Sequence, residues 1–376
     1  MKKIIVWLLM LSLGATTSSE IQTNDKSIMD ESDYAYLSLT YTSLNSEATN
    51  FNEQRTTSFY LYDLKTNKLK EIYTYVGACE YPVGVVDYKN AKVYYSVWGD
   101  PSDASAGDKL QVYDIKTGKI NDITNYHHVF NELDWYNNAL YGIVGGKESN
   151  GVVQLAKIDP TTGEIQPIFS NNTDSVYLDF SIDHNTGEII TTWYSDFARR
   201  RMDVNQENGK ITPCPFFISS VDTSDFSLQS VIYTFSDTPY SSLFDNYGAD
   251  ADSSEVWETA NNLEVSNVSR LNDDILLFIG RESVLDQQAK LMMLNITDKT
   301  TSEIQIPGVA TYYSFVVSPD QQTIFANLQL QDGTQGVFSY NIQTQELKKL
   351  FDINEVLKDF SGNKSVTPTT MQIIIQ

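Results

Sequence analysis

A short turn-like phrase recurs along the chain at nearly constant spacing, and this period limits the possible folds more than any other feature. The phrase occurs as DLKTNKL at 63–69, DIKTGKI at 114–120, DPTTGEI at 159–165, DVNQENGKI at 203–211, NITDKTTSEI at 295–304 and NIQTQEL at 341–347. Successive copies start 51, 45, 44, 92 and 46 residues apart. Because 92 is twice 46, the spacing predicts one degenerate copy between Asp203 and Asn295. Seven repeats of this length, each rich in short strands, predict a ring of four-stranded sheets.

The recurring phrase has the chemistry of a hairpin turn. Asp or Asn at its start can accept hydrogen bonds from backbone amides two or three residues later, and glycine suits the positive φ that closes the turn. Gly118, Gly163 and Gly209 occupy that position, and Asn67 replaces glycine in the first copy. Alternating or apolar runs flank each phrase, which predicts that it joins the two outer strands, C and D, of one blade.

The two inner strands of each blade, A and B, also repeat. Candidate B strands are 92–98, 139–145, 188–195, 230–236, 274–280 and 322–328. The A strands are apolar segments that precede short polar turns, as at 175–182 and 312–318, and DHNTGEI at 183–189 is the A–B turn of blade four. The hidden fifth blade is placed at 216–262, with its inner strands at 216–222 and 230–236.

Blade one lacks an A strand, because its first candidate strand, 34–41, behaves as a B strand. The chain ends in MQIIIQ, and we expect residues 371–376 to supply the missing innermost strand and close the ring. The predicted fold class is therefore all-β: a seven-bladed β-propeller with four-stranded antiparallel blades, closed by the C-terminal strand in blade one.

The repeats resemble those of secreted seven-bladed β-propellers of the broad WD40-like and TolB-like kind. SPDQQTIFAN at 318–327 looks like the Ser-Pro-Asp turn that is common in TolB-like blades. The resemblance implies the architecture and carries over no functional residues.

The N-terminus has the pattern of a secretory signal. Lys2 and Lys3 precede an apolar run over 4–13, which is followed by the small residues Gly14 and Ala15. The sequence thus predicts a signal peptide at 1–15, a flexible segment at 16–33 and a single propeller domain at 34–376. No later run is long enough to span a bilayer, so we expect a secreted, extracellular or periplasmic monomer that does not insert into membranes.

The charge balance limits the partners. Lys and Arg number 26 against 49 Asp and Glu, a formal net charge of −23, so DNA and RNA would be repelled and cationic partners attracted. Cys79 and Cys214 fall at blade junctions that are nearly opposite on a seven-membered ring. We expect both thiols to be unpaired, because a disulfide needs Cα atoms within roughly 7 Å.

Candidate binding residues gather on the loops that join B to C strands and D strands to the next blade. Trp98 and Trp193 end equivalent B strands and could stack on a sugar, and Arg199 and Arg201 could hold an anion. A calcium site, the one cofactor that the sequence suggests, would use carboxylates of the acidic stretch 245–255, namely Asp245, Asp250, Asp252 and Glu255. Asp100, Asp103 and Asp108 offer similar oxygen atoms.

Two functional hypotheses follow. The first is a non-catalytic module that binds a protein, peptide or glycan across this face, which the absence of any linear catalytic motif favours. The alternative is a secreted hydrolase or lyase with an active site at the mouth of the central channel. It would use His127 or His128 with Glu80 or Asp174.

Overall fold

The computed structural model describes residues 35–45, 48, 53–100, 102–103, 105–125, 128–146, 152–169, 173–197, 216–226, 229–235, 264–281, 289–357 and 366–375. All of them belong to one compact unit, Asp33–Gln376. The predicted signal peptide at 1–15 and the segment at 16–33 fall outside the described residues.

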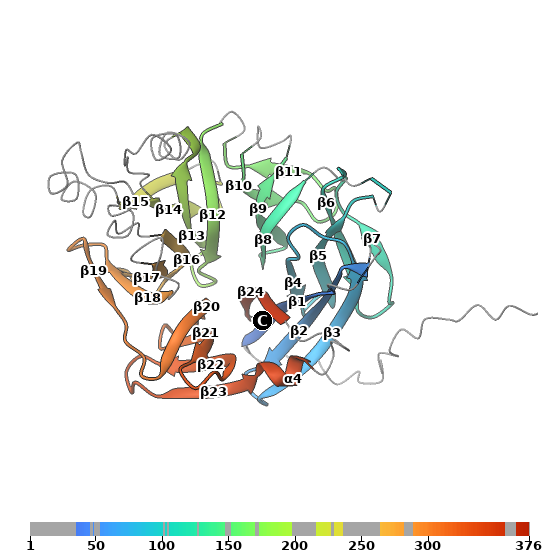
Figure 1. Cartoon of the computed structure of the whole chain (residues 1–376). Coiled ribbons are helices and arrows are strands. Elements are labelled where there is room, and N and C mark those ends of the chain that lie inside the picture. Colours follow the sequence, from blue (N-terminus) through green and yellow to red (C-terminus); the bar gives the residue numbers. More distant parts are fainter. Residues whose placement is uncertain are drawn as a thin grey trace, which may run out of the picture. The chain divides into compact units, whose positions relative to one another are not determined.

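The described strands form six four-stranded antiparallel sheets (Figure 1). Blade one consists of β24 (Val366–Ile375), β1 (Ala35–Leu44), β2 (Arg55–Asp63) and β3 (Lys68–Gly77). Blade two consists of β4 (Gly84–Asp87), β5 (Lys92–Trp98), β6 (Asp108–Asp114) and β7 (Ile120–Asp122). Blade three consists of β8 (Val129–Tyr136), β9 (Ala139–Gly145), β10 (Gln154–Ile158) and β11 (Ile165–Pro167).

The remaining three blades are built in the same order from inside to outside. Blade four consists of β12 (Ser175–Ile182), β13 (Glu188–Ser195), β14 (Phe216–Asp222) and β15 (Gln229–Thr234). Blade five consists of β16 (Glu264–Arg270), β17 (Ile275–Arg281), β18 (Lys290–Asn295) and β19 (Thr300–Glu303). Blade six consists of β20 (Val309–Val317), β21 (Thr323–Leu330), β22 (Gln335–Asn341) and β23 (Leu347–Asp352), followed by the short helix α4 (Ile353–Leu357).

The inner strands contact one another in a closed series: β24 contacts β4, then β4–β8, β8–β12, β12–β16, β16–β20 and finally β20–β24. Apolar clusters fill the spaces between neighbouring sheets, as where Val85 and Tyr94 of blade two pack with Leu133 and Leu140 of blade three. A series that returns to its first member, with every blade packed on two others, defines a β-propeller.

The described strands make six blades, so the prediction of seven blades is wrong. The segments 216–222 and 230–236, predicted as inner strands of a fifth blade, are instead β14 and β15, the outer strands of blade four. β14 pairs with β13, with Trp193 opposite Phe217 and Tyr194 opposite Phe216. The 92-residue step is thus one blade with long connections, and the phrase at 203–211 lies outside the described residues.

The closure by the C-terminal strand is confirmed. β24 pairs antiparallel with β1 from Ala35 opposite Ile375 to Ser43 opposite Val366. Met371 and Ile373 of β24 are buried in the cluster that joins blade one to blade six. The innermost strand of blade one therefore comes from the end of the sequence and its other three strands from the beginning.

Five of the six copies of the recurring phrase form the predicted C–D turn, whereas the copy at 203–211 falls between β13 and β14, the B and C strands of blade four, so the prediction is wrong for it. The Asp63 carboxylate accepts hydrogen bonds from the amides of Lys65 and Thr66, and Asp159 does the same for Thr161 and Thr162. The closing residues have positive φ, at 54° for Asn67 and 73° for Gly163. The Ser318 turn of blade six is an A–B turn, in which the Asp320 carboxylate accepts bonds from the Ser318 hydroxyl and the Gln322 amide.

Side chains of the inner strands link the blades around the axis. The Glu132 carboxylate accepts the Phe180 amide of blade four, and the Asp179 carboxylate accepts the amide of Asn267 in blade five. Gln372 of blade one reaches past blade two to donate its Nε2 to the Leu133 carbonyl of blade three, at 2.7 Å. The inner strands of blades one and three therefore come close together at that level.

Candidate binding face

Strand direction assigns the connections to two faces. Four alternating strands return the chain to the side from which it started, so the B–C and D–A connections share one face, called here the loop face. The A–B and C–D turns share the other, called the turn face. Glu80, Trp98, His128, Asp174 and Trp193, the predicted site residues that the structure describes, all lie at or near the loop face.

Buried Asp108 organises the loop face of blade two. Its carboxylate accepts hydrogen bonds from the backbone amides of Glu80, at 3.1 Å, and Tyr81, at 3.4 Å, in the D–A loop 78–83. The Cys79 thiol donates to the same carboxylate at 3.4 Å. Burial raises the pKa of Asp108 to about 6, and the amide and thiol donors partly offset this rise. Asp108 therefore anchors a loop from beneath.

Three predicted site residues meet around Asp108. Trp98 is its cross-strand partner and donates its indole Nε1–H to the Asp103 carbonyl at 2.9 Å. His128 exchanges two backbone hydrogen bonds with Asp108, and its buried ring lies 5.7 Å from that of Phe130. Glu80 is exposed. The prediction that these residues share one face is consistent with this arrangement, although their binding or catalytic roles stay predictions.

Ser96 completes the anchor under the same loop. Its hydroxyl donates to the Tyr81 carbonyl at 2.8 Å and accepts the Val83 amide at 3.1 Å. The Cys79 thiol, 3.2 Å from the Ser96 hydroxyl, is buried and free, as predicted, whereas Cys214 lies outside the described residues. Burial, together with the negative Asp108, raises the pKa of Cys79 well above its usual value, so it is a protonated thiol and a poor nucleophile.

A second group lies at the loop face of blade four. The Asp174 carboxylate accepts the Ser195 hydroxyl at 3.0 Å and the Phe197 amide at 2.7 Å. Trp193 is stacked on Phe217 with ring centroids 4.2 Å apart and donates its indole N–H to Ser219 at 2.8 Å. Of the other predicted site residues, His127, Arg199, Arg201, Asp245, Asp250, Asp252 and Glu255 lie outside the described residues.

Several exposed apolar side chains lie on the loop face, three of them at blade one and the connection that follows it and one at blade four, a feature that the sequence patterns did not reveal. Among the described residues, seven large apolar side chains are exposed, and four of these lie at loop-face connections or strand ends: Leu44, Val76, Tyr81 and Phe197. Tyr81 is 48% exposed and stands on the loop that Asp108 and Ser96 anchor. The sequence does place Tyr81 beside a proline in a D–A connection. That pattern does not show whether the tyrosine ring is exposed or buried.

Buried carboxylates also line the inner strands. Burial raises the pKa of Asp134 to about 7 and that of Asp179 to about 6, and burial together with the charge of Asp179 raises the pKa of Glu132 well above its usual value. Glu132 and Asp179 accept backbone amides of the next blade, so they serve as ties between blades. Within the described ranges, no group of three or more His, Cys, Asp or Glu side chains could hold a metal ion.

The fold and these contacts define a six-bladed β-propeller with an anchored, partly apolar loop face. No family model and no curated protein matches the chain. Among solved structures, it is similar to TolB from Acinetobacter baumannii at 10% identity, covering 88% of this chain and 65% of TolB, with a TM-score of 0.49. An oligogalacturonate lyase in complex with manganese matches at 11% identity, 71% and 64% coverage and a TM-score of 0.44.

A further similar structure comes from a study of two prolyl endopeptidases, at 10% identity, covering 89% of this chain and 42% of that chain, with a TM-score of 0.46. The chain spans less than two thirds of the length of each of these three proteins. Among the residues that the structure describes, no helix has the length and apolar character needed to cross a membrane.

Proposed function

We propose that this protein is a secreted, non-catalytic binding module that holds a protein or peptide partner on its loop face. The observation that carries the proposal is the exposure of Leu44 and Val76 at the loop-face end of blade one, with exposed Tyr81 in the connection that follows. Exposed apolar side chains gathered on one face are typical of an interaction surface. Secretion rests on the signal pattern of residues 1–15.

The partner is proposed to be a polypeptide with apolar and basic side chains. Leu44 and Val76 are aliphatic, and aliphatic side chains complement peptide side chains better than sugar rings, which stack on aromatic faces. The net charge of −23 favours a cationic partner by long-range attraction. Because Tyr81 stands on an anchored loop, little conformational entropy is lost when it is covered.

The state of the titratable groups supports binding rather than catalysis. Cys79 is held as a neutral thiol, and Asp108 is buried beneath the loop that it anchors. A general base or nucleophile must reach a substrate, and the contacts of these two groups are directed into the fold.

A random-peptide phage library selected on the immobilised full-length protein would test the proposal. We expect selected peptides to contain apolar and basic residues, and Tyr81→Ala to weaken their binding by about tenfold or more, as expected for a central aromatic contact. Ile120→Ala is the matched control, because Ile120 is also 48% exposed but begins β7, next to a C–D turn on the turn face.

Three outcomes would overturn the proposal. One is that no peptide is enriched, and the second is equal weakening by Tyr81→Ala and Ile120→Ala. The third is binding of glycans, in place of peptides, that is lost in Trp98→Ala or Trp193→Ala. Selected peptides that bind Tyr81→Ala normally would also place the binding site elsewhere on the molecule.

A further inference from the structure

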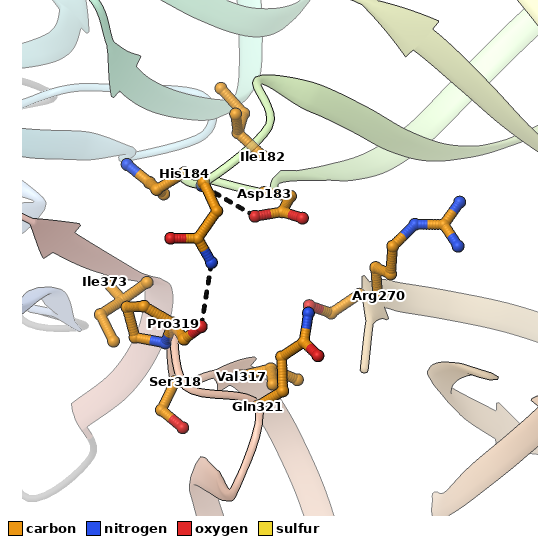
Figure 2. A pocket seen from close by; sticks show the side chains of 11 residues that line it. Ile182, Asp183, His184, Arg270, Val317, Ser318, Pro319, Gln321 and Ile373 are labelled. Carbon is orange, nitrogen blue, oxygen red and sulfur yellow. Dashed lines mark hydrogen bonds between the residues drawn. The ribbon is translucent and has the colours of Figure 1, made fainter. Parts of the chain in front are cut away.

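A small cavity opens among the A–B turns on the turn face, away from the loop face. Its volume is about 30 Å³, room for about two water-sized groups. Ile182, Val317 and Ile373, from blades four, six and one, supply buried apolar side chains to its lining. Ser269 and Arg270 of blade five and the turn residues of blades four and six complete it. Figure 2 shows these side chains converging from separate blades.

A hydrogen bond between blades two apart fixes the rim of this cavity. Asn185 of blade four donates its side-chain N–H to the Pro319 carbonyl of blade six at 2.9 Å (Figure 2). Because a carbonyl can only accept, this bond sets the orientation of the Asn185 amide. The Asn185 Oδ1 then remains as a hydrogen-bond acceptor at the rim.

A carboxylate with an available oxygen also lies at the rim. The Asp183 carboxylate accepts the Asn185 amide with Oδ1 at 2.8 Å, which leaves its other oxygen available. Figure 2 shows the Asp183 carboxylate and the Gln321 amide directed toward the cavity from two different turns. The Ser318 hydroxyl at the rim donates to Asp320, so this donor is already engaged.

The positive charge in the lining is already neutralised. The Arg270 guanidinium forms a two-bond ion pair with Glu188 and also donates to the carbonyls of Asn272 and Asp273. Its side chain points away from the cavity in Figure 2. Burial lowers the pKa of His184 to about 4, so this imidazole is neutral near pH 7. Asp183 therefore gives the cavity an excess of negative charge.

We propose that this cavity binds an alkylammonium group, such as the side chain of a lysine in a partner polypeptide. An ammonium carries three donors and no acceptor, which matches the available oxygens of Asp183 and Asn185. It is also compact, whereas a guanidinium is a wide planar fork, so a cavity of about 30 Å³ favours the ammonium. The apolar lining side chains suit the methylene stem.

This site is on the opposite face from the proposed peptide-binding surface and does not depend on it. The test is an NMR titration of the full-length, isotope-labelled protein with N-acetyl-lysine methylamide. We expect the amide signals of residues 182–185 and 317–321 to shift. N-acetyl-norleucine methylamide, which has an alkyl chain without the charge, should shift them little. Titration with n-butylamine distinguishes a free alkylamine from a peptide-borne lysine.

Two carboxylate variants separate local recognition from general attraction. Asp183→Asn keeps an oxygen for the Asn185 amide and should weaken binding of the lysine derivative by about tenfold. Asp159→Asn is the matched control, because Asp159 accepts two turn amides on the same face but does not line the cavity. Both variants change the net charge equally, so the control should change binding by less than about twofold.

A further variant guards against misfolding of Asp183→Asn. Gln321 has a positive φ of 59°, so Gln321→Gly is compatible with the backbone and removes a polar side chain from the rim. It should weaken binding measurably while the spectrum stays otherwise native. The proposal is overturned if neither amine shifts these signals, if norleucine binds as well as lysine, or if Asp159→Asn weakens binding as much as Asp183→Asn.

Discussion

Replacing Asp134 by asparagine should stabilise the protein at alkaline pH and leave its stability unchanged in acid. Asp134 lies on the inner strand β8, where its side chain is buried and accepts the Trp135 amide at 2.7 Å. Burial raises its pKa from 3.8 to about 7. The folded state therefore disfavours the ionised carboxylate. Asparagine has nearly the same shape, can accept the same amide and carries no charge.

The difference between the folded pKa of about 7 and the ordinary 3.8 sets the size of the effect. At 1.36 kcal/mol for each pH unit, the ionised aspartate costs at most about 4 kcal/mol of folding free energy. We expect a measured gain of about 2–4 kcal/mol, because relaxation and water penetration reduce such penalties. The sign follows from linkage, because the pKa of Asp134 is raised in the folded state. Its contribution to the stability of the natural protein is fully present below pH 3.8 and is lost as the pH rises through about 7.

Urea unfolding at intervals from pH 4 to pH 8 would measure this effect. The stability of Asp134→Asn minus that of the natural protein should be near zero at pH 4 and grow to its full value by pH 8. Asp159→Asn provides a control of opposite sign, because backbone amides lower the pKa of Asp159 and its charged form is the favoured one. A difference for Asp134→Asn that does not vary with pH, or a loss of stability at pH 8, would refute the reasoning.

Two further predictions concern the blades themselves. Gly118 and Gly163 occupy the same turn position, but a Cβ on Gly118 meets nothing within 4 Å, whereas one on Gly163 would lie 2.0 Å from the Ile123 carbonyl oxygen. Thermal unfolding should show that Gly118→Ala costs about 1 kcal/mol and Gly163→Ala at least about 2 kcal/mol more, and equal costs would contradict this. Deleting 366–376 should expose the edge of β1 and cause self-association in size-exclusion chromatography, with a synthetic peptide of the same residues restoring the monomer. A truncated chain that stays monomeric and unfolds at the natural temperature would show that β24 is not needed for closure.

Much of the architecture could be predicted from local chemistry. Each C–D turn needs an Asp or Asn at its start and a residue that tolerates positive φ near its end. A short sequence segment is therefore enough to locate the turn, as at Asp63 and Asn67. The C-terminal strand was predictable because blade one had no inner strand and the apolar end of the chain had no other partner. Pairing the two buries the apolar segment and the edge of β1 together. The blade number was not, because the lengths of the connections between Ser195 and Phe216 and between Thr234 and Glu264 follow no period.

The candidate site was only partly predictable for a related reason. The order of strands places Glu80, Trp98 and His128 on one face, and this could be deduced without coordinates. The sequence grouped Asp108 with Asp100 and Asp103 as a possible source of cation ligands. Asp108 is instead the first residue of β6 and opposite Trp98, so its carboxylate is turned beneath a loop. Which side of a strand becomes buried depends on the neighbouring loop, and one sequence does not contain that information.

The two proposed surfaces should act independently, because they lie on opposite faces of the ring. Gln372 bonds to the Leu133 carbonyl across blade two, and Asn185 bonds to the Pro319 carbonyl across blade five. Each bond joins two blades that are separated by one other blade. Tyr81→Ala should weaken only peptide binding and Asp183→Asn only binding of the lysine derivative. The double variant should show both losses of affinity, each equal to that of the single variant.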